Sequence, residues 1–247
     1  MKPLATAALA AALLATTAAP ASASLSGSLD VGVRLIEQPA SQPWEVNLLL
    51  GGALKATDEI LPPTSKLSFR FPHASVNTAA AATCTAAKPG IIGRLDVKVC
   101  PASSRIGRGT AHVRAGDALI EARVDIFRGP GTDRRLTLFV VAEAGQILGI
   151  TVTMRGTLQK VSDGQFGYRF DMPVPPIPFG SSERVRLADF ALDVGVRRRV
   201  GGRSVPFIQA PRSCPKGGFP FSMAWTMGSR TVTDRKSIKC VIEANAD

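Results

Sequence analysis

The chain has 247 residues and a formal net charge of +11, with 45% hydrophobic but only 6% aromatic residues. A chain of this length can bury roughly 70% of its unfolded surface, so it needs neither a metal nor a disulfide merely to fold. The single Tyr and two Trp disfavour nucleic acid as a partner, because single-strand binding relies on aromatic stacking. The excess of Lys and Arg favours acidic partners instead.

Residues 1–23 have the composition of a secretory signal peptide. Lys2 supplies a positive charge, Leu4–Ala19 is a run of Ala, Leu and Thr, and Ala21-Ser22-Ala23 has the small-x-small pattern that signal peptidase recognises. We therefore predict an exported protein, with residues 24–247 forming a single mature domain. Outside the signal peptide no apolar run is long enough to span a bilayer, so we predict no transmembrane segment.

The first part of the mature chain predicts strands separated by loops. Strands are expected over Leu29–Ile36 and Glu45–Leu50, and a third over Leu67–Phe71, where Pro72 stops it. Residues 79–93 are rich in Ala and predict either a short helix or an irregular loop.

From Gly107 onward the sequence predicts a series of hairpins, because each turn offers a Gly or Asp that tolerates positive φ. Met172–Phe179 contains four prolines, and its lack of donors predicts an extended crossover, the best place for a domain boundary if one exists. The expected strand pairs are Thr110–Arg114 with Leu119–Phe127, Arg135–Ala142 with Ile147–Met154, Thr157–Val161 with Gln165–Phe170, and Phe190–Val200 with Arg203–Ile208.

The last hairpin has the clearest pattern. Phe, Met and Trp occupy every second position of Phe219–Met227, which predicts a strand with one buried face. A two-residue turn at Gly228-Ser229 then pairs Gly217 with Cys240. No segment shows a sustained 3.6-residue apolar period. The predicted fold is therefore all-β, an antiparallel β-sandwich with a jelly-roll-like or barrel variant as the alternative.

The four cysteines predict disulfides, because an even number in an exported chain usually pairs. Three connectivities are possible, and the spacing favours Cys84 with Cys100 and Cys214 with Cys240. Neither pair has the two-residue spacing of zinc ligands, so we predict no metal site and no catalytic thiol. No cofactor motif is present.

Two motifs carry a family resemblance. The first is the Cys-Pro-x-x-Ser-x-Ile-Gly-x-Gly-Thr-Ala segment at Cys100–Ala111, and the second is Ala-Pro-x-x-Cys-Pro-Lys-Gly-Gly at Ala210–Gly218. Together they resemble a group of uncharacterised exported β-rich proteins from actinobacteria, over about residues 67–240. The resemblance implies export, β structure and paired cysteines, and it brings no catalytic residue. The Cys, Gly and Pro of these motifs are interpreted as serving backbone geometry.

The sequence contains no catalytic motif. Only His73 and His112 could act as a base for serine catalysis, and neither has a nucleophile motif nearby, so both are interpreted as surface or satisfied polar residues. A carboxylate pair for glycan hydrolysis depends on spacing in the fold rather than in the sequence. Its candidates, which lie in or beside predicted strands, are Glu121, Asp125, Glu143 and Asp189.

The strongest functional pattern is basic. Arg197, Arg198, Arg199 and Arg203 crowd one hairpin tip. Lesser groups are Arg184 with Arg186, Arg128 with Arg134 and Arg135, and Arg105 with Arg108. We predict a non-catalytic binding or structural protein that uses a basic face to contact an anionic cell-wall polymer or acidic glycan. The alternatives are a secreted glycan hydrolase and a self-associating surface protein.

Overall fold

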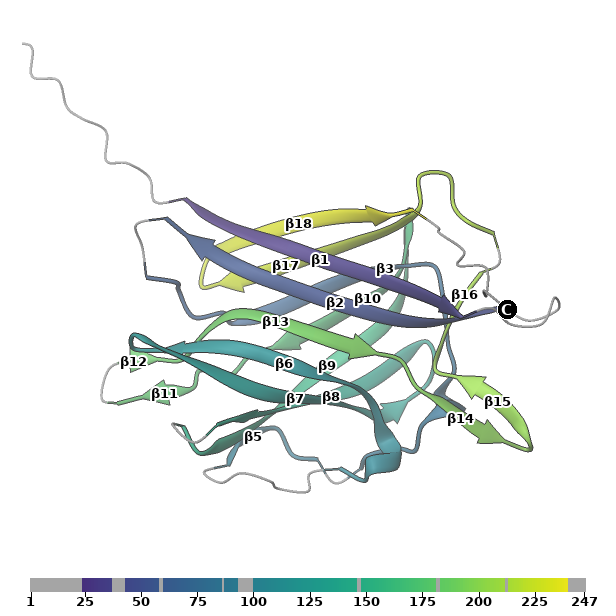
Figure 1. The fold of residues 1–247 in the computed structure, drawn as a ribbon, viewed down its shortest axis with the longest axis horizontal. Helices are drawn as coiled ribbons and strands as arrows, with labels where there is room; N and C mark the ends of the chain where they lie inside the picture. Colours follow the sequence, from purple (N-terminus) through teal and green to yellow (C-terminus); the bar gives the residue numbers. More distant parts are fainter. Residues whose placement is uncertain are drawn as a thin grey trace, which may run out of the picture.

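The computed structural model describes residues 24–36, 43–57, 60–85, 87–92, 100–145, 148–180, 183–211 and 213–239. Nearly all of this part of the chain is β structure (Figure 1). The main sheet contains β1 (Leu25–Ile36), β2 (Trp44–Ala56), β3 (Lys66–Pro72), β4 (Ser75–Val76), β5 (Gly90–Ile92), β6 (Arg105–Ala115), β7 (Ala118–Gly131), β8 (Arg135–Ala144), β9 (Ile150–Asp163), β10 (Phe166–Pro173), β13 (Arg186–Val194), β16 (Ile208–Ala210), β17 (Phe219–Met227) and β18 (Arg230–Ile238). Two small ribbons and two 3₁₀ turns complete it: β11 (Pro178–Phe179) with β12 (Glu183–Arg184), β14 (Arg197–Val200) with β15 (Arg203–Pro206), η1 (Thr78–Ala80) and η2 (Ala102–Ser104).

The main sheet is antiparallel and continuous. Its strands follow the order β18-β17-β3-β10-β9-β8-β7-β6-β13-β2-β16-β4, with β1 paired to β2 and β5 paired to β9. The predicted all-β antiparallel fold is therefore confirmed. The sheet is not closed into a barrel, because no backbone pairing joins β1 to β18 in the described residues. The strands before and after the proline-rich segment 172–182 belong to this same sheet.

The core fills the concave side of the sheet, and β17 shows why the sequence folds this way. The five large apolar side chains at its alternate positions are between 0 and 4% exposed. Phe219 pairs with Ile238, which is the register predicted for the turn at Gly228-Ser229. Phenylalanines from three other strands meet nearby, where the Phe69 ring contacts those of Phe170 and Phe190. Alternation in the sequence thus determines which face of the sheet is buried.

The sheet curls far enough that its two long edge strands, β1 and β18, lie side by side (Figure 1). Two side chains of β18 make polar contacts with β1. The Leu29 N–H donates to Asp234 Oδ2 at 2.7 Å, and Lys236 Nζ lies 2.6 Å from Asp30 Oδ1. On the inner side, a Cβ at Gly27 would lie only 2.7 Å from the ring of Trp225. We call these contacts the β1–β18 seam.

One predicted strand break is wrong. Ile147–Met154 and Thr157–Val161 were expected as separate strands, whereas β9 runs without interruption over Ile150–Asp163. The glycine between them, Gly156, stays in the ladder opposite Leu138. A Cβ at Gly156 would collide with the ring of Phe170, so this glycine makes room for an aromatic side chain and does not mark a turn.

A second prediction, one strand over Phe190–Val200, is also wrong. β13 ends at Val194, and β14 begins at Arg197 in a different sheet. Gly195 lies at the break, where its N–H donates to the Ile106 carbonyl at 2.9 Å. Any Cβ at Gly195 would clash with the Asn47 side chain, so the chain can leave the sheet here only through glycine.

The 79–93 segment contains the end of η1 and the short strand β5. The predicted signal peptide, residues 1–23, lies outside the described residues. In the part of the chain that is described, no helix has the length and hydropathy needed to cross a membrane.

Replacing Asp234 tests the β1–β18 seam. Asp234→Ala removes the acceptor of the Leu29 N–H, and we expect a loss of about 1 kcal/mol in the free energy of unfolding. Urea denaturation monitored by fluorescence measures it. Asp117→Ala, in the exposed turn between β6 and β7, is the matched control and should change stability by less than about 0.5 kcal/mol. Equal effects of the two variants would contradict a stabilising role for the seam.

Candidate functional site: the arginine hairpin

The β14–β15 ribbon projects from the main sheet at one end of the molecule (Figure 1). Its turn is the predicted Gly201-Gly202, with φ values of +57° and +79° that only glycine adopts readily. Val200 pairs directly with Arg203 across this turn. The predicted turn is thus confirmed, whereas both strands are shorter than expected: the first begins only at Arg197, and the second ends at Pro206, before Ile208 begins β16 in the main sheet.

The four arginines of the hairpin divide between its two faces. Residues opposite each other in an antiparallel pair point to the same side, so Arg203 shares a face with Val200 and Arg198. Arg197 and Arg199 point to the other side. Arg198, Arg199 and Arg203 are exposed and make no hydrogen bond or ion pair within the described residues. These three guanidinium groups are available to an external partner.

Arg197 has a different role. Its Nε donates to Glu45 Oε1 at 3.0 Å, and a terminal nitrogen pairs with the second carboxylate oxygen. Glu45 lies in β2 and is only 4% exposed. A buried carboxylate requires charge-assisted hydrogen bonds to offset its lost hydration. Arg197 therefore holds the hairpin to the main sheet. It was predicted to bind an anion together with the other three arginines, whereas in the structure its guanidinium group is paired with Glu45.

The other arginine groups do not extend this cluster into one surface. Arg184 and Arg186 lie at the opposite end of β13 from the hairpin (Figure 1), and Arg186 donates to the Gly116 carbonyl at 3.0 Å. Arg128 is directed to the Thr83 hydroxyl, and burial lowers the pKa of its guanidinium. Arg105 pairs with Asp125 at 3.4 Å.

The candidate hydrolase carboxylates lie on the convex face, with Asp189 in β13, Glu121 and Asp125 in β7, and Glu143 in β8. Each has a basic side chain, Arg or His112, beside it or directly across the ladder. Glu143 lies 2.7 Å from Arg123, and Asp125 pairs with Arg105 and stands opposite Arg108. None of the four lines the interior cavity of the sheet. This arrangement resembles a cross-strand ladder of ion pairs on a solvated face, and it gives no support to a hydrolytic cleft.

His112 lies at the centre of that ladder, between a carboxylate on each neighbouring strand. Its Nδ1 is 2.6 Å from Asp189 Oδ1, and its Nε2 is 3.7 Å from Glu121 Oε2. The hydrogen bond to Asp189 raises the pKa of His112 above its ordinary value of 6.5. The second histidine, His73, is exposed, with Nε2 3.2 Å from the Gly164 carbonyl. Both histidines thus have polar partners, as predicted.

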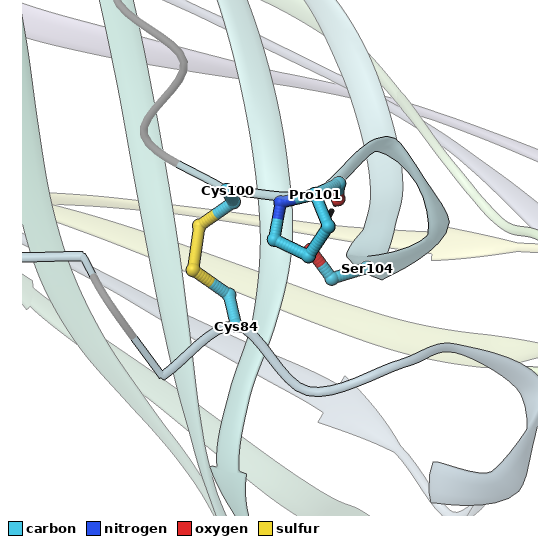
Figure 2. The surroundings of a disulfide bond; sticks show 4 residues. All are labelled: Cys84, Cys100, Pro101 and Ser104. Atoms are coloured by element: carbon cyan, nitrogen blue, oxygen red, sulfur yellow. Dashed lines mark hydrogen bonds between the residues drawn. A yellow bond between two sulfur atoms is a disulfide. The ribbon is translucent and has the colours of Figure 1, made fainter.

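The first motif forms a covalently fixed turn on the convex face (Figure 2). The predicted Cys84–Cys100 disulfide is present, with its two Cα atoms 5.3 Å apart. Next to it, the Ser104 hydroxyl and N–H both donate to the Pro101 carbonyl, at 2.6 and 2.9 Å. Cys84 is fully buried in a small separate cluster, whose other buried members are Ala87, Phe127, Phe139 and Val141. The Cys-Pro-x-x-Ser sequence thus closes a loop over the sheet.

The second motif forms the entry to β17. The Gly218 N–H donates to the Pro215 carbonyl at 2.9 Å, and the Ser237 hydroxyl donates to the Gly217 carbonyl at 2.5 Å. Cys214 is disulfide-bonded. Its predicted partner, Cys240, lies outside the described residues.

Comparison with protein-family models, with curated proteins and with solved structures found no match. The resemblance to exported actinobacterial proteins therefore remains a prediction based on the two motifs. Within the described ranges, no group of three or more His, Cys, Asp and Glu side chains could hold a metal ion.

Two arginines of the hairpin should differ sharply in their effect on stability. Arg197→Ala removes both hydrogen bonds to buried Glu45, and we expect a loss of about 2 kcal/mol in the free energy of unfolding. Arg198→Ala, next to it in β14 but without a partner among the described residues, should change that free energy by less than about 0.5 kcal/mol. Chemical denaturation of both variants measures the difference, and equal stability would refute the anchoring role of Arg197.

The pKa of His112 should fall in Asp189→Asn, because that variant removes the carboxylate at 2.6 Å. An NMR titration of the imidazole protons measures this pKa directly. Since the folded-state pKa is raised, the stabilisation by His112 is complete below pH 6.5 and is lost as the pH rises through the folded value. Glu121→Gln, which alters the partner at 3.7 Å, should lower the pKa less. An unchanged pKa in Asp189→Asn would contradict this assignment.

Proposed function

We propose that this protein is an exported, non-catalytic binding or structural protein of the cell envelope, which contacts an anionic polymer through the arginine hairpin. The observation that carries the proposal is a set of three exposed guanidinium groups that have no partner in the described part of the chain, Arg198, Arg199 and Arg203. Arginine forms bidentate hydrogen bonds to carboxylate, phosphate and sulfate groups, so a projecting ribbon of this kind suits a repeating anion.

The anchoring of the ribbon supports this proposal. The pair between Arg197 and Glu45 fixes its base on the main sheet, so less conformational freedom is lost when the other three arginines bind. The net charge of +11 adds long-range attraction for a polyanion. Export is proposed from the predicted signal peptide, and the Cys84–Cys100 disulfide is compatible with an oxidising compartment.

Retention on immobilised dextran sulfate across a salt series tests the proposal, with neutral dextran as the matched matrix. Wild-type protein should bind only dextran sulfate and elute with salt. In the triple variant Arg198→Ala/Arg199→Ala/Arg203→Ala, the slope of log affinity against log salt should fall by roughly one per arginine.

The control variant removes the same number of charges elsewhere. Arg114, Arg134 and Arg135 are exposed and lie outside the hairpin, so their triple alanine variant should retain most of the wild-type slope. Equal losses in the two triple variants would mean that binding depends on net charge alone. Retention of wild-type protein on neutral dextran would also count against an anion-binding hairpin. Purified cell envelope is the natural second matrix.

A further inference from the structure

The concave side of the sheet encloses an apolar cavity of about 210 Å³. Inward-facing side chains from strands on both halves of the sheet line it, among them Leu50, Phe69, Val124, Val140 and Phe221. Protein interiors rarely contain voids larger than a water molecule, and an apolar cavity of about 150 Å³ already stays dry and accepts a small hydrocarbon. The volume is therefore large enough to hold an apolar ligand.

The lining of the cavity extends along the whole of β3. Thr64, just before β3, and His73, just after it, both line the cavity, and the inward residues of β3 lie between them. The seven residues of β3 span about 23 Å at the usual rise of a strand. A space of this length and modest volume matches a single extended chain better than a compact ring system.

Polar groups are almost absent from the lining. Among the lining residues of the described chain, three carry polar side chains: Thr64 at one end of β3, and His73 and Tyr168 toward the other. His73 Nε2 lies 3.2 Å from the Gly164 carbonyl, and Tyr168 has a backbone hydrogen bond with Val76. Thr64 is 5% exposed, and its hydroxyl has no hydrogen-bond partner among the residues that the structure describes. A buried hydroxyl without a partner is costly, and native structures nearly always satisfy such groups. A ligand oxygen that accepts a hydrogen bond at this end of the cavity would satisfy it.

We propose that the cavity binds one long aliphatic chain of a lipid, with an oxygen of its carboxyl or ester group accepting a hydrogen bond from the Thr64 hydroxyl. The apolar lining binds the chain by removing it from water. The Thr64 hydroxyl gives the chain a direction, because it lacks a partner among the described residues, whereas His73 and Tyr168 at the opposite end already have backbone partners.

This site is independent of the arginine hairpin. Val194 and Phe207, which precede and follow the hairpin, line the cavity, while the hairpin itself lies outside it. Phe207 belongs to the end of the cavity near His73, because its carbonyl accepts from the Asn77 N–H at 2.8 Å. The head group would lie at the other end of β3, beside Thr64. Charge removal in the hairpin should therefore leave lipid binding unchanged.

The proposal is tested by titrating delipidated mature protein with palmitic acid in an isothermal titration calorimeter. We expect saturable binding of one palmitate per protein chain. Hexanoic acid, which is shorter by ten carbons, should bind at least 100-fold more weakly because it buries less apolar surface. Val140→Phe fills the middle of the cavity and should weaken palmitate binding at least tenfold. Leu119→Phe, an exposed change on β7 outside the cavity, should leave it unchanged. If Val140→Phe does not fold, as judged by circular dichroism, the smaller Ala142→Leu replaces it.

Thr64→Val tests the head-group contact, because it removes only the hydroxyl while keeping the shape of the side chain. We expect palmitate affinity to fall about fivefold. Thr153→Val is the matched control, since the Thr153 hydroxyl is also buried without a partner in the described ranges but does not line the cavity. Its palmitate affinity should equal that of wild type.

Two results would overturn the proposal. Wild-type protein that takes up no palmitate would make the cavity a dry packing void. Palmitate binding that survives Val140→Phe but falls in the hairpin triple variant would mean adsorption of the carboxylate to the basic surface. Failure of dextran sulfate binding leaves this proposal intact, because the two assays use different probes and different residues.

Discussion

The structure depends on one constraint, which is that a single curled sheet must cover a common interior from all sides. Because the curled strands share that interior, their inward positions must be apolar, and their outward positions carry the charge. The two long edge strands meet without a backbone ladder. Asp234 and Lys236 of β18 instead make polar contacts with Leu29 and Asp30 of β1. Such contacts occupy an edge that would otherwise be free to pair with another chain.

Much of this fold could be predicted, because strand alternation and turn residues are local signals. The hairpin from Phe219 to Ile238 was predicted with its register, since the alternation and the Gly228-Ser229 turn agree. The roles of two glycines that serve packing were not predicted. Gly156 makes room for the Phe170 ring inside a continuous strand, and Gly195 makes room for Asn47 where a strand ends. A sequence does not distinguish these uses, because the neighbour that decides between them is distant along the chain.

Some residues of the candidate sites could be recognised in the sequence, but the contacts between them could not be predicted from it. The hairpin and its Gly201-Gly202 turn follow from sequence, whereas the pair between Arg197 and Glu45 joins residues 152 positions apart. The convex ladder was equally hidden, because His112 meets Asp189 only through the pairing of β6 with β13. Nothing in the sequence indicated that Thr64 belongs to a candidate site. It lies in a predicted loop, and only the fold shows that its hydroxyl is buried at one end of an apolar cavity.

The break at Gly195 connects the fold to both proposed sites. If β13 continued past Val194, residues 197–199 would extend the main sheet, and inward alternation would place at least one of these arginines against the apolar interior. Burying that charge would require a partner that the cavity lining does not contain. By leaving the sheet at Gly195, the chain moves its arginines outside and returns with Phe207, which is 2% exposed and lines the cavity. Separation of a basic ribbon from an apolar interior is therefore a consequence of where this strand ends.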